Sequence, residues 1–226
     1  MADRAAKDAL YDGFAVVGRA LASGRRTEVI DLLAQGERSV EEIAAELSQS
    51  VANTSQHLQQ LLRAGLVVTR RDGNRIFYSL ASSRVSELWA AMRDVAEAHV
   101  AELDRLAHAY LGDRSQLDMI DRDQLAKRLK AGDVVVLDVR PVAEYDAGHI
   151  PGALSVPIAE VGKRLRDLPK GKQVVAYCRG PYCVYADEAV RLLGKRGIRA
   201  ARLEDGYPEW EAARLPVSRK SSPATA

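Results

Sequence analysis

The sequence predicts a multidomain fold: a mainly α-helical N-terminal domain with a β-hairpin, followed by an α/β domain with a parallel sheet. The 226 residues are enough for two domains of the common size, about 100 residues each. In the first half, apolar residues recur at helical spacing around one short hairpin. In the second half, continuous β-branched runs alternate with helical stretches, which is typical of strands buried on both faces.

The composition and the ends of the chain narrow the class of protein. No apolar run approaches the roughly 18 residues that span a bilayer. Residues 1–10 lack the apolar stretch of a signal peptide. We therefore expect a cytoplasmic protein without membrane contact. The two cysteines, Cys178 and Cys183, lie in one short segment. In a reducing compartment such a pair is more often catalytic, redox-active or metal-binding than structural.

The first half begins with helices. They are expected over residues 5–23, 25–35, 40–47 and 51–64. Gly36 and Gly65 end the second and fourth of them. Ser39 opens the third helix, and Glu42 three residues later completes a capping box. The last two helices are separated only by a short polar turn, and the second helix of such a pair can enter the major groove of DNA.

A hairpin and a long helix follow. Residues 66–69 and 75–80 have the pattern of two strands joined at Asp72-Gly73-Asn74. A helix is expected over residues 83–111, and its apolar stripe is too long for one small domain to cover. Part of that helix is therefore expected to form a dimer surface. Residues 112–117 are polar and form the expected linker.

The helix pair and the basic hairpin together predict a winged helix-turn-helix domain over residues 1–111. Amide and hydroxyl side chains on the second helix can pair with base edges, and the hairpin arginines suit phosphates or the minor groove. The predicted DNA-binding residues are Ser50, Asn53, Ser55, Gln56, Gln59, Gln60, Arg70, Arg71 and Arg75. A winged helix that binds a protein is the alternative, but nothing apolar replaces the polar face and the hairpin is basic.

The run ELSQSVANTSQHLQQLLRAGLVVTRRDGNRIFYSL resembles the ArsR-type bacterial repressors, a resemblance that covers roughly residues 8–110. It implies a homodimer, formed through the first and last helices, that binds a palindromic operator in double-stranded DNA. Many members of that family sense metals. Here the helix over residues 40–47 has no cysteine, and His99 and His108 lack the spacing of the zinc-type site. We expect these histidines to be ordinary surface residues, and we expect no metal and no cofactor.

The second half shows three strands and three helices in alternation. The strands are expected over residues 134–139, 174–178 and 200–203, and the helices over residues 122–130, 159–168 and 184–196. The domain is expected to cover residues 118–217, and the polar tail 218–226 is expected to be disordered.

Three segments of this half resemble the rhodanese family: VVVLDVRPVAEYDAGHIPGALSVP, VVAYCRGPYCVYADEAVRLLGKRG and LEDGYPEWEAARLPV. The resemblance implies the α/β rhodanese fold with a parallel sheet, and it implies that Cys178 is the nucleophile that carries a persulfide. Asp138, Arg140 and His149 match family positions near the cysteine loop. For these three a structural role is favoured over catalysis: Arg140 pairs with a carboxylate, and His149 bonds a backbone group. Trp210 is expected in the core.

The residues themselves support a reactive thiol. Cys178 ends a strand, and a short loop leads from it into a helix whose N-terminus favours an anion. Such a setting lowers the pKa of a thiol and makes it a nucleophilic thiolate. Arg179 is expected to hold an anionic donor such as thiosulfate or a persulfide. The expected site is therefore Cys178 with Arg179, supported by Asp138 and Arg140.

Three departures from the family pattern bear on that site. Pro181 removes one N–H from the loop. Glu144 stands where thiosulfate-specific enzymes often have a basic residue. Cys183 has two open interpretations: a resolving thiol that bridges to Cys178, or a residue that only packs against the sheet. A phosphatase of related fold is disfavoured, because the position that would hold its arginine is Val184.

Two functions follow from this fusion, and the sequence leaves both open. In the first, the chain is a transcriptional repressor whose rhodanese domain forms a persulfide on Cys178 and senses or transfers reactive sulfur. In the second, it is a working sulfurtransferase that the winged helix tethers to DNA or that regulates its own operon. A rhodanese-type activity with thiosulfate or a persulfide as donor is expected in either case. A passive dimer-stabilising module is disfavoured, because an inert domain needs no nucleophile in an anion-binding loop.

Overall fold

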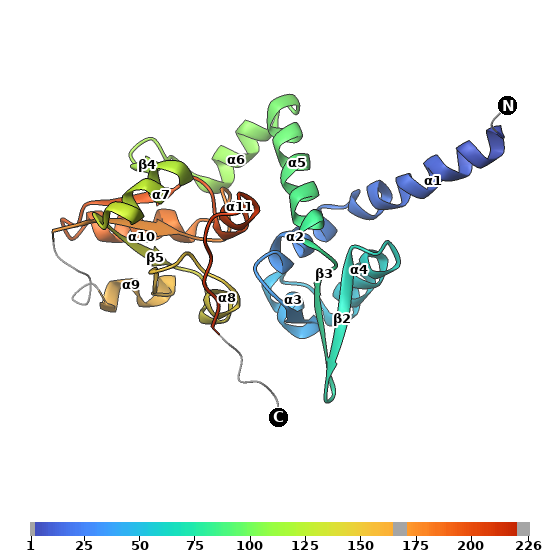
Figure 1. Ribbon diagram of the computed structural model, residues 1–226, viewed down its shortest axis with the longest axis horizontal. Coiled ribbons are helices and arrows are strands. Elements are labelled where there is room, and N and C mark those ends of the chain that lie inside the picture. Colours follow the sequence, from blue (N-terminus) through green and yellow to red (C-terminus); the bar gives the residue numbers. More distant parts are fainter. Residues whose placement is uncertain (1–2, 165–170, 221–226) are drawn as a thin grey trace. The chain divides into compact units, whose positions relative to one another are not determined.

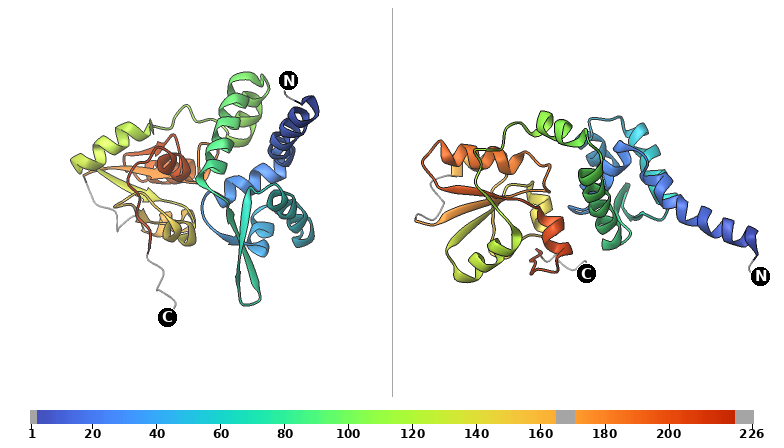
Figure 2. Two further views of the ribbon diagram at one scale, coloured as in Figure 1. Left: turned by 45° about the vertical axis from the view of Figure 1, so that its right-hand side comes forward. Right: turned by 90° about the horizontal axis from the view of Figure 1, so that it is seen from above.

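A computed structural model describes residues 3–164 and 171–220 of the chain. It contains two compact units, residues 1–93 and 94–226, which are described separately (Figure 1, Figure 2). In the part of the chain described, no helix is long and apolar enough to cross a membrane. The end of the helix expected over residues 159–168 and most of the expected tail lie outside the described residues.

The first unit is a winged helix. Its elements are α1 (Arg4–Leu21), α2 (Gly24–Leu33), β1 (Arg38–Ser39), α3 (Val40–Glu46), α4 (Val51–Arg63), β2 (Val67–Asp72), β3 (Arg75–Leu80) and the first part of α5 (Ser83–His99). The capping box of Ser39 and Glu42 is present. Asp72 pairs with Arg75, so Gly73 and Asn74 form a two-residue turn, and Gly73 has a φ of 57°. Figure 1 shows β2 and β3 as a hairpin that projects from this unit.

The core of this unit is formed mainly by α2, α3 and α4. Ile30, Ile43, Leu58 and Leu61 are fully buried. Leu62 of α4, in contrast, is 41% exposed. One residue turns the helix by about 100°, so Leu61 and Leu62 cannot both face a narrow core. The strand β1 was not expected, since it has only two residues, and it pairs with β3.

The helix expected over residues 83–111 is interrupted. It consists of α5 and a separate α6 (Leu103–Leu111). Between them, the Leu103 N–H donates to the Val100 carbonyl, which breaks the regular ladder in which each N–H bonds the fourth residue back. Neither glycine nor proline marks this point, so the apolar pattern did not reveal it. The two units divide within α5, at residue 93, and the predicted domain limits of 1–111 and 118–217 stay a prediction.

The second unit is an α/β domain. After α6 it contains β4 (Met119–Ile120), α7 (Arg122–Ala131), β5 (Val134–Asp138), α8 (Val142–Ala147), β6 (Leu154–Ser155), α9 (Ile158–Arg164), β7 (Gln173–Tyr177), α10 (Tyr185–Gly194), β8 (Ala200–Leu203) and α11 (Tyr207–Ala212). The strands are parallel and lie in the order β4-β8-β7-β5-β6. This confirms the predicted parallel sheet, to which the structure adds the two-residue strands β4 and β6.

Two apolar clusters fill the second unit, one on each face of the sheet. One cluster joins the sheet to α9 and α10, and the other joins it to α7 and α11 (Figure 2). As expected, Trp210 is buried, and its Nε1–H donates to the Pro216 carbonyl at 2.8 Å. The sheet is thus covered on both sides, and β7 lies at its centre. The loop that follows β7 therefore starts from the centre of the sheet.

Candidate functional site

The segment 178–183 joins the central strand β7 to α10, and it is called the cysteine loop below. Cys178 follows β7 directly and is only 2% exposed. Its carbonyl accepts a hydrogen bond from the Tyr207 N–H at 3.1 Å. At the other end, the Cys183 N–H donates to the Gly180 carbonyl at 3.1 Å and closes a turn. Sheet and turn together fix both ends of the loop.

The two cysteines are bonded to each other. The sulfur atoms of Cys178 and Cys183 lie 2.11 Å apart, and their Cα atoms lie 6.2 Å apart. Cys183 therefore does more than pack against the sheet, although it also contacts the apolar cluster around α10. In this oxidised form neither sulfur is a thiolate, so the predicted nucleophile belongs to the reduced form. The role of Cys183 as a resolving thiol stays a prediction.

Arg179 is held by a carboxylate of the protein. Its guanidinium contacts both carboxylate oxygens of Glu144 in α8, with Nη2 2.6 Å from Oε1 and Nε 3.1 Å from Oε2. The side chain of Glu144 is 1% exposed and that of Arg179 is 16% exposed. A buried bidentate pair of this kind carries no net charge. The role predicted for Arg179 in holding the donor stays a prediction.

Asp138 and Arg140 form a buried network beside the loop. Arg140 Nη2 donates to Asp138 Oδ2 at 2.5 Å and to the Gly148 carbonyl at 2.7 Å. Tyr177 OH also donates to Asp138 Oδ2, at 2.5 Å. Burial disfavours the Arg140 cation, but the bonds and the charge of Asp138 outweigh it and raise the pKa of Arg140. The expected pairing of Arg140 with a carboxylate is present, and the network ties the ends of β5 and β7 together.

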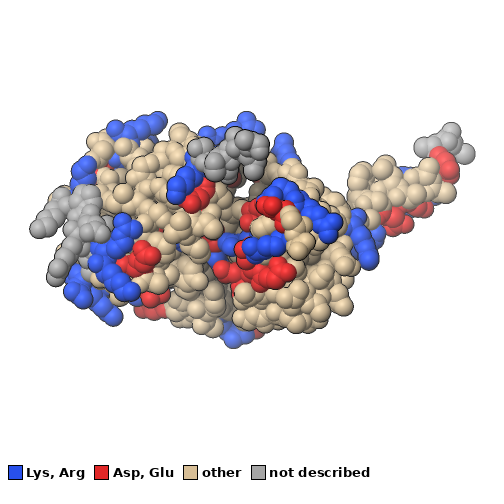
Figure 3. All heavy atoms as spheres, turned by 90° about the horizontal axis from the view of Figure 1, so that it is seen from below, with Lys and Arg blue, Asp and Glu red and all other residues tan. Residues whose placement is uncertain are grey.

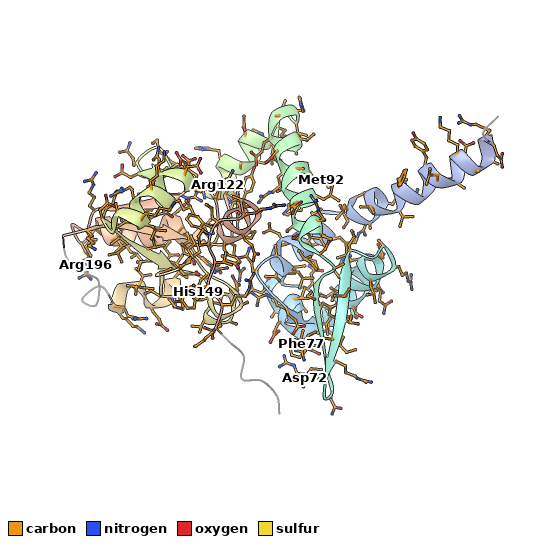
Figure 4. All side chains as sticks on the ribbon, in the orientation of Figure 1. Asp72, Phe77, Met92, Arg122, His149 and Arg196 are labelled. Atoms are coloured by element: carbon orange, nitrogen blue, oxygen red, sulfur yellow. A yellow bond between two sulfur atoms is a disulfide. The ribbon has the colours of Figure 1, made fainter. Side chains whose placement is uncertain are left out.

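His149 also has the expected kind of partner. Its Nδ1 lies 2.8 Å from the Tyr145 carbonyl oxygen, and its ring stacks on the Tyr145 ring with 3.7 Å between centroids. Figure 4 labels His149 in the second unit. These contacts give His149 a structural place outside the cysteine loop.

A second charged cluster lies behind the cysteine loop, and the sequence reasoning missed it. Arg114 and Arg202 both contact the fully buried carboxylate of Asp187, at 2.6 Å and 3.2 Å. Both arginines also reach the backbone of the loop: their guanidinium groups donate to the Pro181 carbonyl at 2.8 Å and 3.5 Å. The one signal in the sequence was the charged Arg202 inside the otherwise apolar strand β8. Arg114 gave no signal, because it lies in the expected linker.

Gly206 packs directly on the cysteine loop, and its replacement by alanine is expected to displace that loop. A Cβ at this position would lie 2.3 Å from the Gly180 nitrogen and 2.4 Å from the Arg179 carbonyl carbon. We expect Gly206→Ala to lower the free energy of unfolding by about 1–3 kcal/mol, as overpacking does. It should also slow alkylation of reduced Cys178, measured with iodoacetamide at fixed pH.

The matched control is Gly194→Ala. Gly194 ends α10 and has nothing within 4 Å of an added Cβ. Alanine there should leave Cys178 alkylation unchanged and raise helix stability by up to about 1 kcal/mol. Equal alkylation rates in Gly206→Ala and in the unchanged protein would show that the contact of Gly206 does not set the position of the loop.

Five of the six predicted base-reading residues lie on α4, and the sixth, Ser50, directly precedes it. Asn53, Gln56 and Gln59 are exposed, and Ser55 is half-buried. Ser50 precedes the helix, and its hydroxyl accepts a hydrogen bond from the Asn53 N–H at 3.2 Å, so it caps α4. The remaining residue, Gln60, accepts a hydrogen bond from Arg26 Nη1 at 2.7 Å.

The three wing arginines differ in their partners. Arg70 pairs with Glu37 at 2.7 Å and with Asp72 at 3.2 Å, and these bonds raise its pKa. Arg75 pairs with Glu42 at 3.1 Å. Arg71 is exposed and makes no ion pair among the described residues. Figure 4 shows Asp72 near the tip of the hairpin, and Figure 3 shows acidic and basic side chains side by side on one face of the molecule. The positive charge of the hairpin arginines is therefore partly neutralised by neighbouring carboxylates.

Comparison with known proteins separates the chain into the same two parts. The model of the "Bacterial regulatory protein, arsR family" matches residues 23–69, and the model of the "Rhodanese-like domain" matches residues 121–213. The sulfurtransferase of Allochromatium vinosum is 35% identical over 100 residues, which cover 43% of this chain and 92% of that protein. The solved homodimeric winged helix-turn-helix domain of Mb0332 from Mycobacterium bovis is 45% identical; the match covers 45% of this chain and 93% of that chain, with a TM-score of 0.42.

One relative matches across both parts. The HTH-type transcriptional regulator Rv0324 of Mycobacterium tuberculosis is 48% identical over 211 residues. The match covers 93% of this chain and 92% of that protein, so it includes the helix-turn-helix and the rhodanese-like domain in the same order. The chain belongs to the arsR family of bacterial transcriptional regulators, and it joins the winged helix of that family to a rhodanese-like domain.

Proposed function

We propose that this regulator binds a palindromic operator as a homodimer in the cytoplasm, and that sulfur chemistry at Cys178 changes its affinity for that operator. The observation that carries the proposal is the position of Cys178: it directly follows the central strand, beside a second cysteine close enough to bond. The winged helix contains no cysteine of its own. A signal of reactive sulfur can therefore enter this chain only through the rhodanese-like domain.

The chemistry begins with the reduced form. The Cys178 thiolate attacks the outer sulfur of a low-molecular-weight persulfide, and the donor leaves as its thiol. Cys178 then carries a persulfide. If the Cys183 thiolate attacks the inner sulfur of this persulfide, hydrosulfide leaves and the bond between the two cysteines forms. The oxidised structure is thus the expected end of a reaction that needs only the donor.

Exposed apolar side chains support the homodimer. On α1, Leu10, Tyr11 and Phe14 are each more than half exposed, and on α6 the same holds for Tyr110. Figure 1 shows α1 extending away from the other elements of its unit. Contiguous apolar residues of this size on a helix seldom face water in a monomer. Two copies that cover these helices would present two α4 helices to a palindromic site.

A working sulfurtransferase is the second candidate, and one observation favours it. The match to the sulfurtransferase of Allochromatium vinosum spans nearly the whole of that protein. On this hypothesis Cys178 turns over continuously, and its state does not alter DNA binding. The two candidates therefore differ in a measurable quantity: the operator affinity of the modified protein.

The test is an operator titration by fluorescence anisotropy at fixed salt, because the affinity for DNA depends on ionic strength. The duplex is selected from a random-sequence library with the reduced protein. The titration compares reduced protein, protein treated with cysteine persulfide, and Cys178→Ser treated in the same way. We expect treatment to change the affinity by roughly 5–150-fold, a coupling of about 1–3 kcal/mol, and to leave Cys178→Ser unaffected.

Equal operator affinities in all three samples would contradict the hypothesis that the protein senses reactive sulfur. In that case, cyanide-dependent turnover of thiosulfate decides the alternative: turnover that is lost in Cys178→Ser would establish the sulfurtransferase. Absence of both the affinity change and the turnover would remove sulfur chemistry from the function of this chain.

A further inference from the structure

Arg114 connects the cysteine loop to the chain that precedes the rhodanese-like domain. It lies between α6 and β4, outside residues 121–213 that match the family model. Its Nη1 donates to the Pro181 carbonyl at 2.8 Å, and its Nη2 donates to the Cys183 carbonyl at 3.4 Å. One guanidinium thus holds two carbonyls at the Cys183 end of the loop.

A buried carboxylate, that of Asp187, orients the Arg114 side chain. Arg114 Nε donates to Asp187 Oδ2 at 2.6 Å, and the Asp187 side chain is fully buried in α10. Arg202 contacts the other oxygen of the same carboxylate at 3.2 Å. Because a guanidinium is planar, anchoring its Nε side sets where its remaining N–H groups point. The contacts of Arg114 with the loop are therefore anchored by a buried ion pair and do not belong to an exposed surface pair.

The other cysteine is held independently. Cys178 is buried at the end of β7, and its carbonyl accepts from the Tyr207 N–H. These contacts are made by backbone carbonyls and not by the sulfur atoms, so we expect them to persist when the bond between the sulfur atoms is opened. Two groups kept at bonding distance react as if at high effective concentration.

We propose that Arg114 is a positioning residue that holds Cys183 within reach of the persulfide on Cys178. The inference rests on the proposed persulfide chemistry and names the residue that controls its second step. In that step the Cys183 thiolate bonds to the inner sulfur of the persulfide. The bond from the inner to the outer sulfur breaks, and hydrosulfide leaves with the electron pair. The two cysteines are oxidised and the outer sulfur is reduced, so no further oxidant is needed.

The contact of Arg114 with the cysteine loop also connects the loop to the segment 113–114. Arg191 Nη2 donates to the Asp113 carbonyl at 2.9 Å, so the residue before Arg114 is also bound to α10. Among the residues that the structure describes, Arg191 makes no hydrogen bond to the cysteine loop, whereas Arg114 makes two. The pair of arginines therefore offers a matched comparison: both hold the segment 113–114, but only Arg114 holds Cys183.

The experiment uses the full chain and three variants: Arg114→Gln, Arg114→Lys and Arg191→Gln. Each reduced protein is mixed with one equivalent of cysteine persulfide, and hydrosulfide release is followed with a sulfide electrode. Loading of Cys178 is followed in parallel by mass spectrometry. We expect Arg114→Gln to release hydrosulfide about tenfold more slowly at unchanged loading, because it loses charge-assisted bonds to the loop. Arg191→Gln should match the unchanged protein, and Arg114→Lys should fall between, because it keeps the charge without the planar fork.

A second measurement does not depend on persulfide formation. The equilibrium between dithiol and disulfide in glutathione buffers reports the effective concentration of Cys183. A tenfold loss of effective concentration in Arg114→Gln should raise the reduction potential by about 30 mV. Equal potentials and equal release rates in Arg114→Gln and Arg191→Gln, with both variants folded by circular dichroism, would overturn the assignment. If the unchanged protein forms no persulfide, the proposed function fails, and the potentials alone decide the role of Arg114.

Discussion

Replacement of Asp138 by asparagine is expected to lower the free energy of unfolding of the second unit by about 3–5 kcal/mol. Asp138 and Arg140 are both fully buried, and their closest contact is 2.5 Å. The variant leaves the Arg140 cation buried without its carboxylate, and it also weakens the bond from Tyr177 OH. The measurement is urea unfolding of the full chain, followed by the fluorescence of Trp210 in a Trp89→Phe background.

The matched control is Asp133→Asn in the same background. Asp133 directly precedes β5, and Asp138 is the last residue of that strand. The carboxylate of Asp133 lies 3.4 Å from Arg128, and the Asp133 side chain is 55% exposed. An exposed pair of this kind contributes less than about 1 kcal/mol. If Asp138→Asn is no more destabilising than this control, the buried network does not stabilise the ends of β5 and β7.

Features that depend on neighbouring residues could be predicted from the sequence. The capping box of Ser39 and Glu42 lies within one helical turn, and the hairpin turn at Gly73 needs only a residue that tolerates positive φ. The position of Cys178 after a β-branched run also follows from local pattern, because such a run is a strand and its end is where a parallel sheet places chemistry. These predictions were confirmed because short-range geometry alone decides them.

Features that depend on distant residues could not be predicted. The partner of Arg179 is Glu144, from α8, and the partner of Arg114 is Asp187, from α10. The sequence pattern indicated a donor-binding cation at Arg179 and a linker around Arg114. Ion pairs across such separations are set by the packing of the sheet and its helices, and no periodicity in the sequence records them. The gap between α5 and α6 was missed for the related reason that no glycine or proline marks it.

The neutral pair of Arg179 and Glu144 bears on the choice of sulfur donor. Thiosulfate carries two negative charges, whereas a low-molecular-weight persulfide presents one on its reactive sulfur. In the structure the Arg179 charge is already balanced by a carboxylate that is 1% exposed. Pro181 in addition supplies no backbone N–H to the cysteine loop. If Cys178 accepts sulfur as proposed, we therefore expect the unchanged protein to react faster with a donor of lower charge than with thiosulfate.

Glu144→Gln is expected to raise the rate of Cys178 persulfide formation from thiosulfate by roughly 10–100-fold relative to the rate from cysteine persulfide. Glutamine keeps the size and one acceptor of glutamate but removes the charge, so the Arg179 guanidinium can make charge-assisted bonds to the dianion. The measurement is single-turnover loading of reduced Cys178 by mass spectrometry, in which thiosulfate leaves as sulfite.

The control for the change in net charge is Glu160→Gln. Glu160 is exposed in α9 and lies 3.9 Å from Arg164, so its removal changes the total charge without touching Arg179. If loading from thiosulfate rises equally in both variants, long-range attraction explains it, and the effect should then vanish at high salt. If it rises in neither, Arg179 does not meet the donor at all, and its role is to brace the loop against α8. Only a rise confined to Glu144→Gln assigns donor choice to this buried pair, because only there has the balance of charge next to Cys178 been altered.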